Sequence, residues 1–315
     1  MTNHNSNNNE RDVAICKPNN SDNGKVGKHT CYTSNELFQL RDAWNMRHTQ
    51  NPISADDPIE IWNILKQQMS TVCGSNEMCW LYSEFAQSSL QYLRNVFVPE
   101  KPQSWISNPT QWLTSTDISR VLKQYEDAYP DFIFIGPSPI DYDATPYTNS
   151  NACVWQDLCD FSLPRLISSG KQKVSVIFNL DTHDQTGSHW VSLYCDVRLR
   201  SIYYFDSNKN SQSNKIPDNI IKFINGIIVN MAEEPLSQTF KFYNNDKIQH
   251  QMKNTECGMY CLYFIISLLT GEKKWEDWVD NKQGKNGGRV SDIEMEKKRN
   301  ELFNSPVVIG GSKLT

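Results

Sequence analysis

Apolar residues recur at helical spacing over much of the first third of the chain. Residues 34–40 open with Ser34, which can cap a helix, and Pro58 stands where a first helical turn accepts a proline before residues 59–65. Residues 77–96 repeat apolar side chains at three- and four-residue intervals. These segments predict a small helical N-terminal domain over residues 34–104. A proline-rich stretch, residues 98–105, is the expected linker to the next region.

Residues 105–305 mix short apolar or alternating runs, typical of strands, with segments of helical periodicity. Strands are predicted at residues 132–135, 174–180, 189–195, 201–205 and 239–243, and helices at residues 118–125, 154–166, 216–231, 257–269 and 292–303. The five residues between the third and fourth strands suit an antiparallel hairpin. The pattern predicts an α+β fold, a central mixed sheet flanked by helices.

The two ends of the chain are polar. Residues 1–33 are rich in Asn, Ser, Lys and Asp, and this composition predicts a disordered arm because few apolar side chains offset the entropy of ordering. Residues 306–315 are expected to be a short tail. The amino terminus is Asn-rich where a signal peptide would be apolar, and no apolar run reaches the roughly 20 residues of a membrane span. We therefore expect an unsecreted protein without membrane contact.

Composition excludes some classes of function. The chain has 315 residues and a net charge of −5, so binding of nucleic acid through overall charge is not expected. Its nine cysteines are an odd number and lack CxxC spacing with nearby histidines. We expect reduced thiols in a cytosol-like compartment, with no disulfide framework, no zinc or other metal site and no cofactor.

Cys257 is the first candidate for chemistry. A polar, turn-prone run ends at this residue and passes directly into the apolar residues 262–269, so Cys257 is predicted at a helix N-terminus. Unpaired N–H groups and the helix dipole at that position favour a thiolate. Gly258 follows and has no Cβ, which lets a substrate backbone or a loop approach closely.

His189 and Asp206 are the predicted partners of this thiol. His189 begins one strand of the predicted hairpin and Asp206 follows the end of the next, 17 residues later. In an antiparallel hairpin these two ends lie side by side, so the carboxylate can orient the imidazole. The imidazole can then hold Cys257 as a thiolate and protonate a leaving amine.

Gln251 lies six residues before Cys257 in the preceding loop. Its amide can donate a hydrogen bond to the oxyanion that forms when a thiolate attacks a carbonyl, together with the backbone N–H of Cys257. Gln249 is a neighbouring candidate, and the spacing favours Gln251.

Taken together, these residues resemble the motif set of the adenain and ubiquitin-like-protein-processing cysteine protease superfamily. The matching elements, in order, are His189-Trp190, Asp206-Ser207, Gln251 and Cys257-Gly258. Further segments are similar to the polyprotein-processing proteases of large cytoplasmic DNA viruses, including the African swine fever virus type: residues 112–118, residues 129–141, and Asp292-Ile-Glu-Met295 with Arg299 and Phe303. The resemblance covers roughly residues 105–305 and implies a papain-like, adenain-like protease core over that range.

The resemblance implies an endopeptidase that cuts after Gly-Gly-Xaa-like sequences in viral polyprotein or virion core precursors. The implied roles are nucleophile for Cys257, general base and acid for His189, orientation of His189 for Asp206 and oxyanion donor for Gln251, with Trp190 and Gly258 binding substrate. A late viral protein of the host cytoplasm, packaged in the virion, is the implied setting. The chain also contains Gly287-Gly288-Arg289 and Gly310-Gly311-Ser312, which raises the hypothesis of self-processing at the C-terminus.

Three alternatives remain open at this point. The first is a deconjugase acting on ubiquitin or a ubiquitin-like modifier, which would share the Gly-Gly preference. The second is a cysteine-dependent acetyltransferase on a related fold. The third is a non-catalytic binding module, against which the intact set of four polar residues argues. Residues 34–104 are expected to cover the catalytic domain and to help select substrates.

Overall fold

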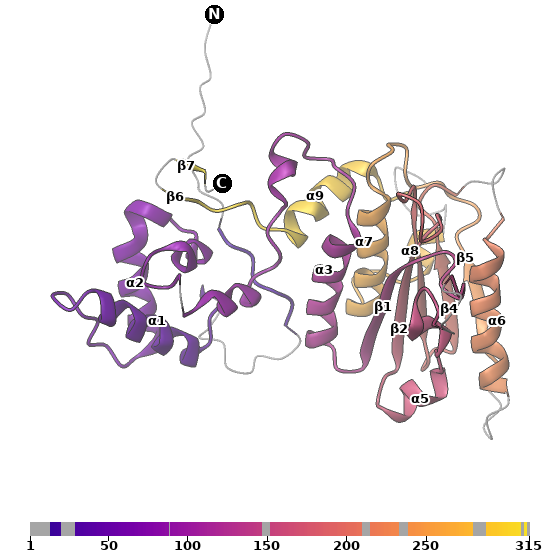
Figure 1. Cartoon of the computed structure of the whole chain (residues 1–315), viewed down its shortest axis with the longest axis horizontal. Helices are drawn as coiled ribbons and strands as arrows, with labels where there is room; N and C mark the ends of the chain where they lie inside the picture. The colour runs from indigo at the N-terminus through magenta and orange to yellow at the C-terminus, as the bar shows by residue number, and fades with distance from the viewer. Residues whose placement is uncertain are drawn as a thin grey trace, which may run out of the picture. The chain divides into compact units, whose positions relative to one another are not determined.

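The chain divides into two compact units in the computed structural model (Figure 1). The first contains Met1–Ile106 and Asn300–Thr315, and the second contains Ser107–Arg299. The structure describes residues 13–19, 29–87, 89–146, 152–209, 215–232, 239–279, 288–309 and 312–313. Residues 300–305, which the sequence analysis assigned to the second region, belong to the first unit. The amide of Asn304 explains this, because it hydrogen-bonds the backbone of Ile15 and the carbonyl of Val98.

Helices of the first unit begin at capping residues. Thr33 caps α1 (Ser34–Arg47) one residue before the predicted cap, and Asp57 caps α2 (Pro58–Cys73). The expected helix over residues 77–96 is instead interrupted: the chain forms the 3₁₀ helices η2 (Glu77–Tyr82) and η3 (Gln91–Val96), followed by η4 (Gln103–Ile106). The Ser83 hydroxyl donates to the Trp80 carbonyl, a local bond that competes with helix continuation.

Part of the amino-terminal arm is folded into the first unit, unlike the disordered arm expected for residues 1–33. Cys31 and Tyr32 are buried in the core of this unit, and the Tyr32 hydroxyl donates to the Glu77 carbonyl at 3.0 Å. Hydrophobic pattern alone did not reveal this, because the segment contains few apolar residues and those are anchored by contacts distant in sequence. Residues 1–12 and 20–28 lie outside the described residues.

Three disulfides correct the expectation that all cysteines are reduced. They join Cys16 to Cys31, Cys73 to Cys79, and Cys153 to Cys159, with Cα separations of 5.2, 5.5 and 6.4 Å. A disulfide requires Cα atoms within about 7 Å and suitably directed side chains, and it needs no particular sequence spacing. Turns such as the one at Gly74, where φ is 59°, bring the paired cysteines within that distance.

The second unit is built on a five-stranded mixed sheet in the order β1-β2-β3-β4-β5. The strands are β1 (Phe132–Pro139), β2 (Lys173–Asn179), β3 (Trp190–Asp196), β4 (Ser201–Phe205) and β5 (Lys241–Asn244). Strand β1 is parallel to β2, β2 and β3 are antiparallel, β3 and β4 form an antiparallel hairpin, and β4 is parallel to β5. The hairpin and the five predicted strands are therefore confirmed, with ends shifted by up to four residues.

Helices cover both faces of this sheet (Figure 1). The helices from residue 115 onward are α3 (Ser115–Ala128), α4 (Gln156–Cys159), α5 (Leu163–Ser168), α6 (Asp218–Ala232), α7 (Cys257–Thr270), α8 (Glu276–Val279) and α9 (Asp292–Leu302), of which α3 and α7 lie on one side of the sheet and α6 on the other. Alternate strand residues such as Val176 and Leu193 join Ile220 of α6 in one core, and Phe205 stacks on Phe264 of α7 on the opposite face. The α+β prediction is confirmed.

One predicted helix divides in two. The segment 154–166 was expected to be continuous, but α4 ends at Cys159 and α5 begins at Leu163. The Ser162 side chain caps α5 and Pro164 lies in its first turn, so the chain restarts a helix at this point.

Short elements near the C-terminus complete the first unit. Strand β6 (Val308–Ile309) pairs antiparallel with β7 (Ser312–Lys313) within the expected tail. Of the two Gly-Gly sequences considered for self-processing, Gly287 and Gly310-Gly311 lie outside the described residues.

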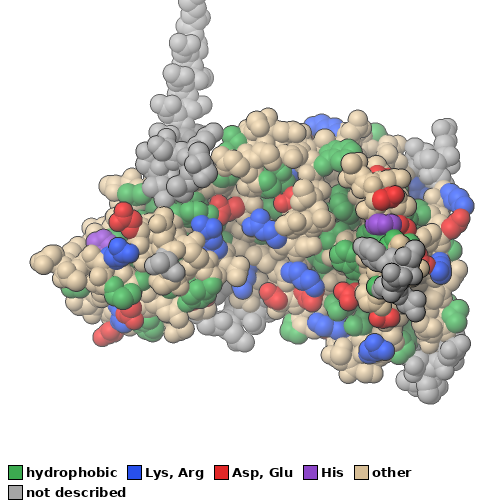
Figure 2. All heavy atoms as spheres, in the orientation of Figure 1, with side chains coloured by type: hydrophobic (Ala, Val, Ile, Leu, Met, Phe, Trp, Pro, Cys, Tyr) green, Lys and Arg blue, Asp and Glu red, His purple; other side chains and the backbone are tan. Residues whose placement is uncertain are grey.

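Surface properties agree with the composition. Figure 2 shows basic and acidic side chains interspersed on the face that it presents. Within the described ranges, the helices are all too short or too polar to cross a bilayer.

Candidate functional site

The β3–β4 hairpin brings His189 and Asp206 together. His189 immediately precedes β3 and Asp206 immediately follows β4, and the imidazole Nε2 lies 2.7 Å from the Asp206 Oδ1. Both side chains are partly buried, with 18% and 16% of their surface exposed. A charged pair that is largely shielded from water interacts more strongly than one on the surface. The structure therefore brings the two side chains within hydrogen-bonding distance.

Asn245 holds the backbone of Asp206 and was not anticipated from the sequence. Its side chain accepts a hydrogen bond from the Asp206 N–H at 2.9 Å and donates one to the Asp206 carbonyl at 2.7 Å. Asn245 is fully buried and follows β5, which runs parallel to β4. The only signal in the sequence was a polar residue directly after a strand, which is common and unspecific.

Helix α7 presents Cys257 to the imidazole. As predicted, the helix begins at Cys257, and the residue is 2% exposed. Nearly every residue of α7 is buried, so the helix is a central packed element rather than an amphipathic surface helix. Because Nε2 of His189 faces Asp206, the other ring nitrogen is left for the thiol.

His189 is strongly affected by this environment. Burial disfavours the charged ring and lowers its pKa, but hydrogen bonds with Asp206 and Cys257 and the negative charges of both partners outweigh burial and raise the pKa of His189 to about 10. The imidazolium form of His189 is therefore favoured at neutral pH. A proton is available at the site for transfer to a leaving group.

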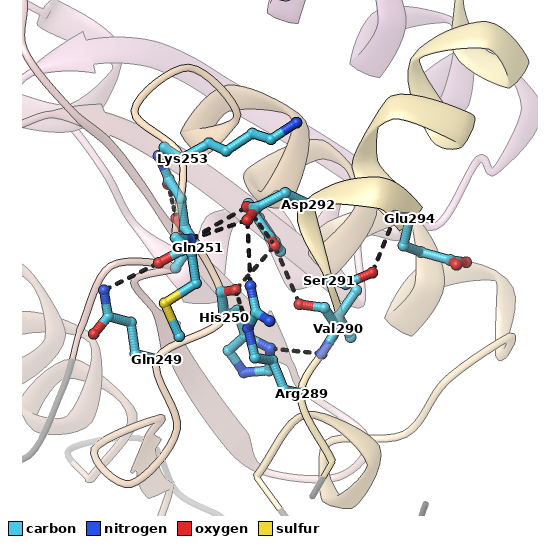
Figure 3. Close-up of polar contacts among 12 residues, drawn as sticks. Gln249, His250, Gln251, Lys253, Arg289, Val290, Ser291, Asp292 and Glu294 are labelled. Carbon is cyan, nitrogen blue, oxygen red and sulfur yellow. Dashed lines mark hydrogen bonds and ion pairs between the residues drawn. The ribbon is translucent and has the colours of Figure 1, made fainter. Parts of the chain in front are cut away.

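Gln251 lies in the loop before α7, beside Lys253 (Figure 3), and its side-chain amide is held at both ends. The Ser207 hydroxyl donates to Gln251 Oε1 at 2.7 Å, and Gln251 Nε2 donates to the Lys253 carbonyl at 2.6 Å. The Lys253 carbonyl can only accept, which assigns the NH₂ end of the amide. One N–H of that NH₂ group is used in this bond, and a second N–H remains on the nitrogen.

Gly258 has a packing reason for lacking a side chain. A Cβ at this position would lie 2.9 Å from the Cβ of Leu113. The sequence analysis allowed either a substrate or a loop to approach Gly258, and the structure places the loop residue Leu113 there. Trp190 contacts the same loop, since its indole Nε1 donates to the Leu113 carbonyl at 3.1 Å.

A cleft of about 590 Å³ extends from Trp190 within the second unit. Its walls come from the segment 111–115, the end of β1 and the loop between β2 and β3. The aromatic and aliphatic residues in these walls are Trp112, Leu113, Val154, Trp155 and Trp190. Polar side chains, among them Asn179, Asp181 and His183, also line the cleft, so it combines apolar and polar walls.

A buried ion pair supports the start of α7 and was also missed. Glu256, the residue before Cys257, is fully buried and its carboxylate lies 2.8 Å from Nη2 of Arg299 on α9. Arg299 also donates through Nη1 to the Gln111 carbonyl at 2.9 Å. The guanidinium thus connects α9 to the start of α7 and to the segment that leads to Leu113.

The grouping of potential metal ligands found in the described ranges lies elsewhere, in the first unit. It consists of Cys16, Cys31 and Glu77. The two sulfurs are joined in a disulfide, and the Glu77 carboxylate accepts hydrogen bonds from Thr30, Cys31 and Trp62. These atoms are already occupied by internal bonds.

Comparison with known proteins identifies the class. Residues 170–302 match the Ulp1 protease family, C-terminal catalytic domain. A thiol protease of Acanthamoeba polyphaga mimivirus is 28% identical over 278 residues, covering 82% of this chain and 85% of the relative. A SUMO-1 cysteine protease of African swine fever virus is 25% identical over 202 residues, covering 62% of this chain and 69% of the relative.

A solved structure extends the likeness to the fold of nearly the whole chain. The crystal structure of a protease of African swine fever virus superposes with a TM-score of 0.58 and 19% identity, covering 93% of this chain and 98% of that one. The protein is a cysteine protease. Over residues 170–302 it is similar to the catalytic domain of the Ulp1 protease family, and it is similar along most of its length to a viral thiol protease.

Proposed function

We propose that the protein is an endopeptidase whose nucleophile is Cys257, with His189 as general base and acid. Asp206 orients the imidazole, and Gln251 together with the backbone N–H of Cys257 stabilises the oxyanion. The observation that carries the proposal is the position of His189, whose Nε2 is hydrogen-bonded to Asp206 and whose pKa is raised by both Asp206 and Cys257.

The proposed reaction has two stages. The Cys257 thiolate attacks the scissile carbonyl carbon, and the oxyanion that forms accepts hydrogen bonds from Gln251 and the helix N-terminus. The imidazolium of His189 then gives its proton to the leaving amine as the C–N bond breaks, which leaves a thioester on Cys257. His189, now neutral, takes a proton from water as the water oxygen attacks the thioester, and the C–S bond breaks to release the acid and restore the Cys257 thiolate beside the imidazolium.

The proposed substrates are proteins cut after Gly-Gly-Xaa-like sequences. Trp190 and Leu113 are bonded to one another at the edge of the cleft, so a chain passing over them meets a rigid aromatic wall. Residues without side chains fit such a passage best. The viral origin of the relatives supports virion core precursors as substrates, with the host cytoplasm and the virion as the sites of action.

A second candidate is deconjugation of a ubiquitin-like modifier. It is favoured by the similarity to the Ulp1 protease family and by a relative that is a SUMO-1 cysteine protease. Modifier tails end in glycines, so both substrates would pass the same aromatic wall. The two functions differ in what must bind beyond the cleft, a folded modifier or an extended precursor.

One experiment separates these functions. Purified protein is incubated with Gly-Gly-Xaa precursor peptides and, in parallel, with modifier conjugates, and the new N-termini are sequenced. We expect cleavage of the precursors and none in the Cys257→Ala variant. Cleavage of conjugates alone would favour the deconjugase, and equal cleavage by wild type and Cys257→Ala would reject Cys257 as nucleophile.

A further inference from the structure

The loop that carries Gln251 is held on its far side by residues 289–292 (Figure 3). The Met252 N–H donates to both carboxylate oxygens of Asp292, at 3.1 and 3.3 Å. Arg289 Nε donates to the His250 carbonyl at 2.7 Å. The peptide groups on either side of Gln251 are therefore both bound by one short segment, which is distant in sequence from the loop.

Tyr260 connects the same segment to the helix of the nucleophile. It lies on α7, three residues after Cys257, and its hydroxyl is 3.0 Å from Asp292 Oδ1 and 3.1 Å from the His250 carbonyl. Burial raises the pKa of Tyr260 and the Asp292 carboxylate raises it further, so the hydroxyl keeps its proton. A carboxylate is the strongest acceptor available for that proton. Asp292 consequently binds both the loop of Gln251 and the helix of Cys257.

His250 supports this arrangement without titrating near neutral pH. Its Nδ1 accepts from the Val290 N–H at 3.1 Å, and its Nε2 lies 3.0 Å from the Trp278 carbonyl, to which it donates. Burial lowers the pKa of His250 to about 4. A neutral ring is what these two bonds require, one accepting and one donating nitrogen. The backbone of the loop is thus held in one place over the working pH range.

We propose that Asp292 is a positioning residue for the oxyanion site. It places Gln251 through the Met252 N–H and sets the distance of that loop from Cys257 through Tyr260. The inference rests on the proposed role of Gln251. It also gives a function to Asp292, which lies in a segment that resembles the viral proteases. Asp292 bonds backbone and helix rather than Gln251 itself, and its side chain is only 7% exposed. A displacement of about 1 Å in a catalytic group can cost about 100-fold in rate, so such support is consequential.

The test separates formation of the oxyanion site from formation of the thiolate. Full-length wild type, Asp292→Ala, Asp292→Asn, Tyr260→Phe and Gln251→Ala are compared for kcat and KM on a Gly-Gly-Xaa peptide. In parallel, the rate of alkylation of Cys257 by iodoacetamide is measured, with mass spectrometry to identify the site. Alkylation forms a C–S bond and expels iodide, without an oxyanion, so it needs the thiolate and the imidazole but not Gln251.

The matched control is Glu296→Gln. Glu296 lies on α9 like Asp292 and pairs with Lys253 of the same loop, but through two partly exposed side chains. Such pairs contribute little. We expect kcat, KM and alkylation of this variant to equal those of wild type.

For Asp292→Ala we expect kcat to fall by about 10- to 100-fold, below the 10²- to 10³-fold cost of losing one oxyanion donor. KM and the alkylation rate should stay within about threefold, a split that general disruption would not produce. In Asp292→Asn, kcat should fall less because the side chain keeps one acceptor oxygen. The Gln251→Ala/Asp292→Ala double variant should have a kcat no lower than that of Gln251→Ala.

Two results would overturn the inference, and a third would remove its premise. Normal kcat in Asp292→Ala, with an impaired Gln251→Ala, would reject the positioning role alone. Parallel losses of kcat and alkylation in both Asp292→Asn and Tyr260→Phe would indicate a purely structural role. Normal kcat in Gln251→Ala would reject the oxyanion assignment itself, independently of Asp292.

Discussion

At the scale of single residues, the site depends on an imidazole whose charge is stabilised from two directions. Hydrogen bonds with Asp206 and Cys257 more than compensate for the burial of His189. Asn245 holds the backbone of Asp206, so the carboxylate keeps its place beside the ring. The residue types at positions 189, 206 and 257 could be selected from the sequence, but Asn245 could not, because its role exists only through contact between β4 and β5.

The first prediction concerns pH. The raised pKa of His189, about 10, predicts that kcat/KM stays high through neutral pH and falls as pH rises through about 10. Asp206→Asn removes a hydrogen bond and a charge that raise the pKa, so the alkaline fall should move to lower pH. The pH profile of kcat/KM measures this.

A linked effect on stability has the same sign. The pKa of His189 in the folded protein lies above the unfolded value near 6.5. The ionised imidazole therefore contributes fully to the free energy of unfolding below about pH 6.5, and this contribution is lost as pH rises to about 10. Asp206→Asn should reduce this contribution. If kcat/KM of wild type and of Asp206→Asn falls at the same alkaline pH, the assignment of Asp206 is contradicted.

At the scale of secondary structure elements, α7 is the one on which the site depends. Its start at Cys257 follows from the change from polar to apolar residues and was predictable from the sequence. Two supports of that start were not: Leu113 against Gly258, and Arg299 against Glu256. Both join segments that are far apart in the chain, and no local pattern reports which of them will meet.

Gly258→Ala should be destabilising, because its Cβ would lie 2.9 Å from Leu113 Cβ in a packed interior. We expect a loss of about 1–3 kcal/mol in the free energy of unfolding. The control is Gly226→Ala in α6, where nothing lies within 4 Å, and a gain of about 0.5–1 kcal/mol is expected. Denaturant unfolding of both variants checks this, and equal stability of the two would contradict it.

Arg299→Met removes one partner of a buried ion pair while keeping most of the side-chain volume. Glu256 is fully buried, so an uncompensated charge should cost about 3–5 kcal/mol in unfolding free energy. Lys215→Met, which breaks the exposed pair with Asp218, should change nothing measurable. Unchanged denaturation of Arg299→Met would show that the pair contributes no net support to α7.

At the scale of the whole molecule, the two units are assembled in different ways. The second unit is continuous in sequence, from Ser107 to Arg299. The first unit takes strands, helices and turns from both ends of the chain, and Asn304 bonds the backbone at Ile15 and Val98. Hydrogen bonds of Ile15 with Asn304 and of Tyr32 with Glu77 attach the polar amino-terminal arm to the rest of this unit.

The disulfide of the arm should contribute measurably to stability. Closing a 15-residue loop between Cys16 and Cys31 is worth about 3 kcal/mol in the loop-entropy description. Cys16→Ser/Cys31→Ser should lower unfolding free energy by about that amount. A reductant should destabilise wild type more than it destabilises this variant. Coincident denaturation curves of wild type with and without reductant would contradict the bridge.

What the sequence by itself determined is the local part of this protein. Hydrophobic periodicity and capping residues located the hairpin, the helix at Cys257 and the order of the four candidate site residues, because these features depend on neighbours within a few positions. Tertiary structure alone decided the pairing of cysteines, the folding of the arm, and the supports at Asn245, Arg299 and Asp292. Those contacts depend on how the strands pair and how segments many residues apart pack. Contacts between residues so far apart in the chain do not produce a periodic pattern in the sequence.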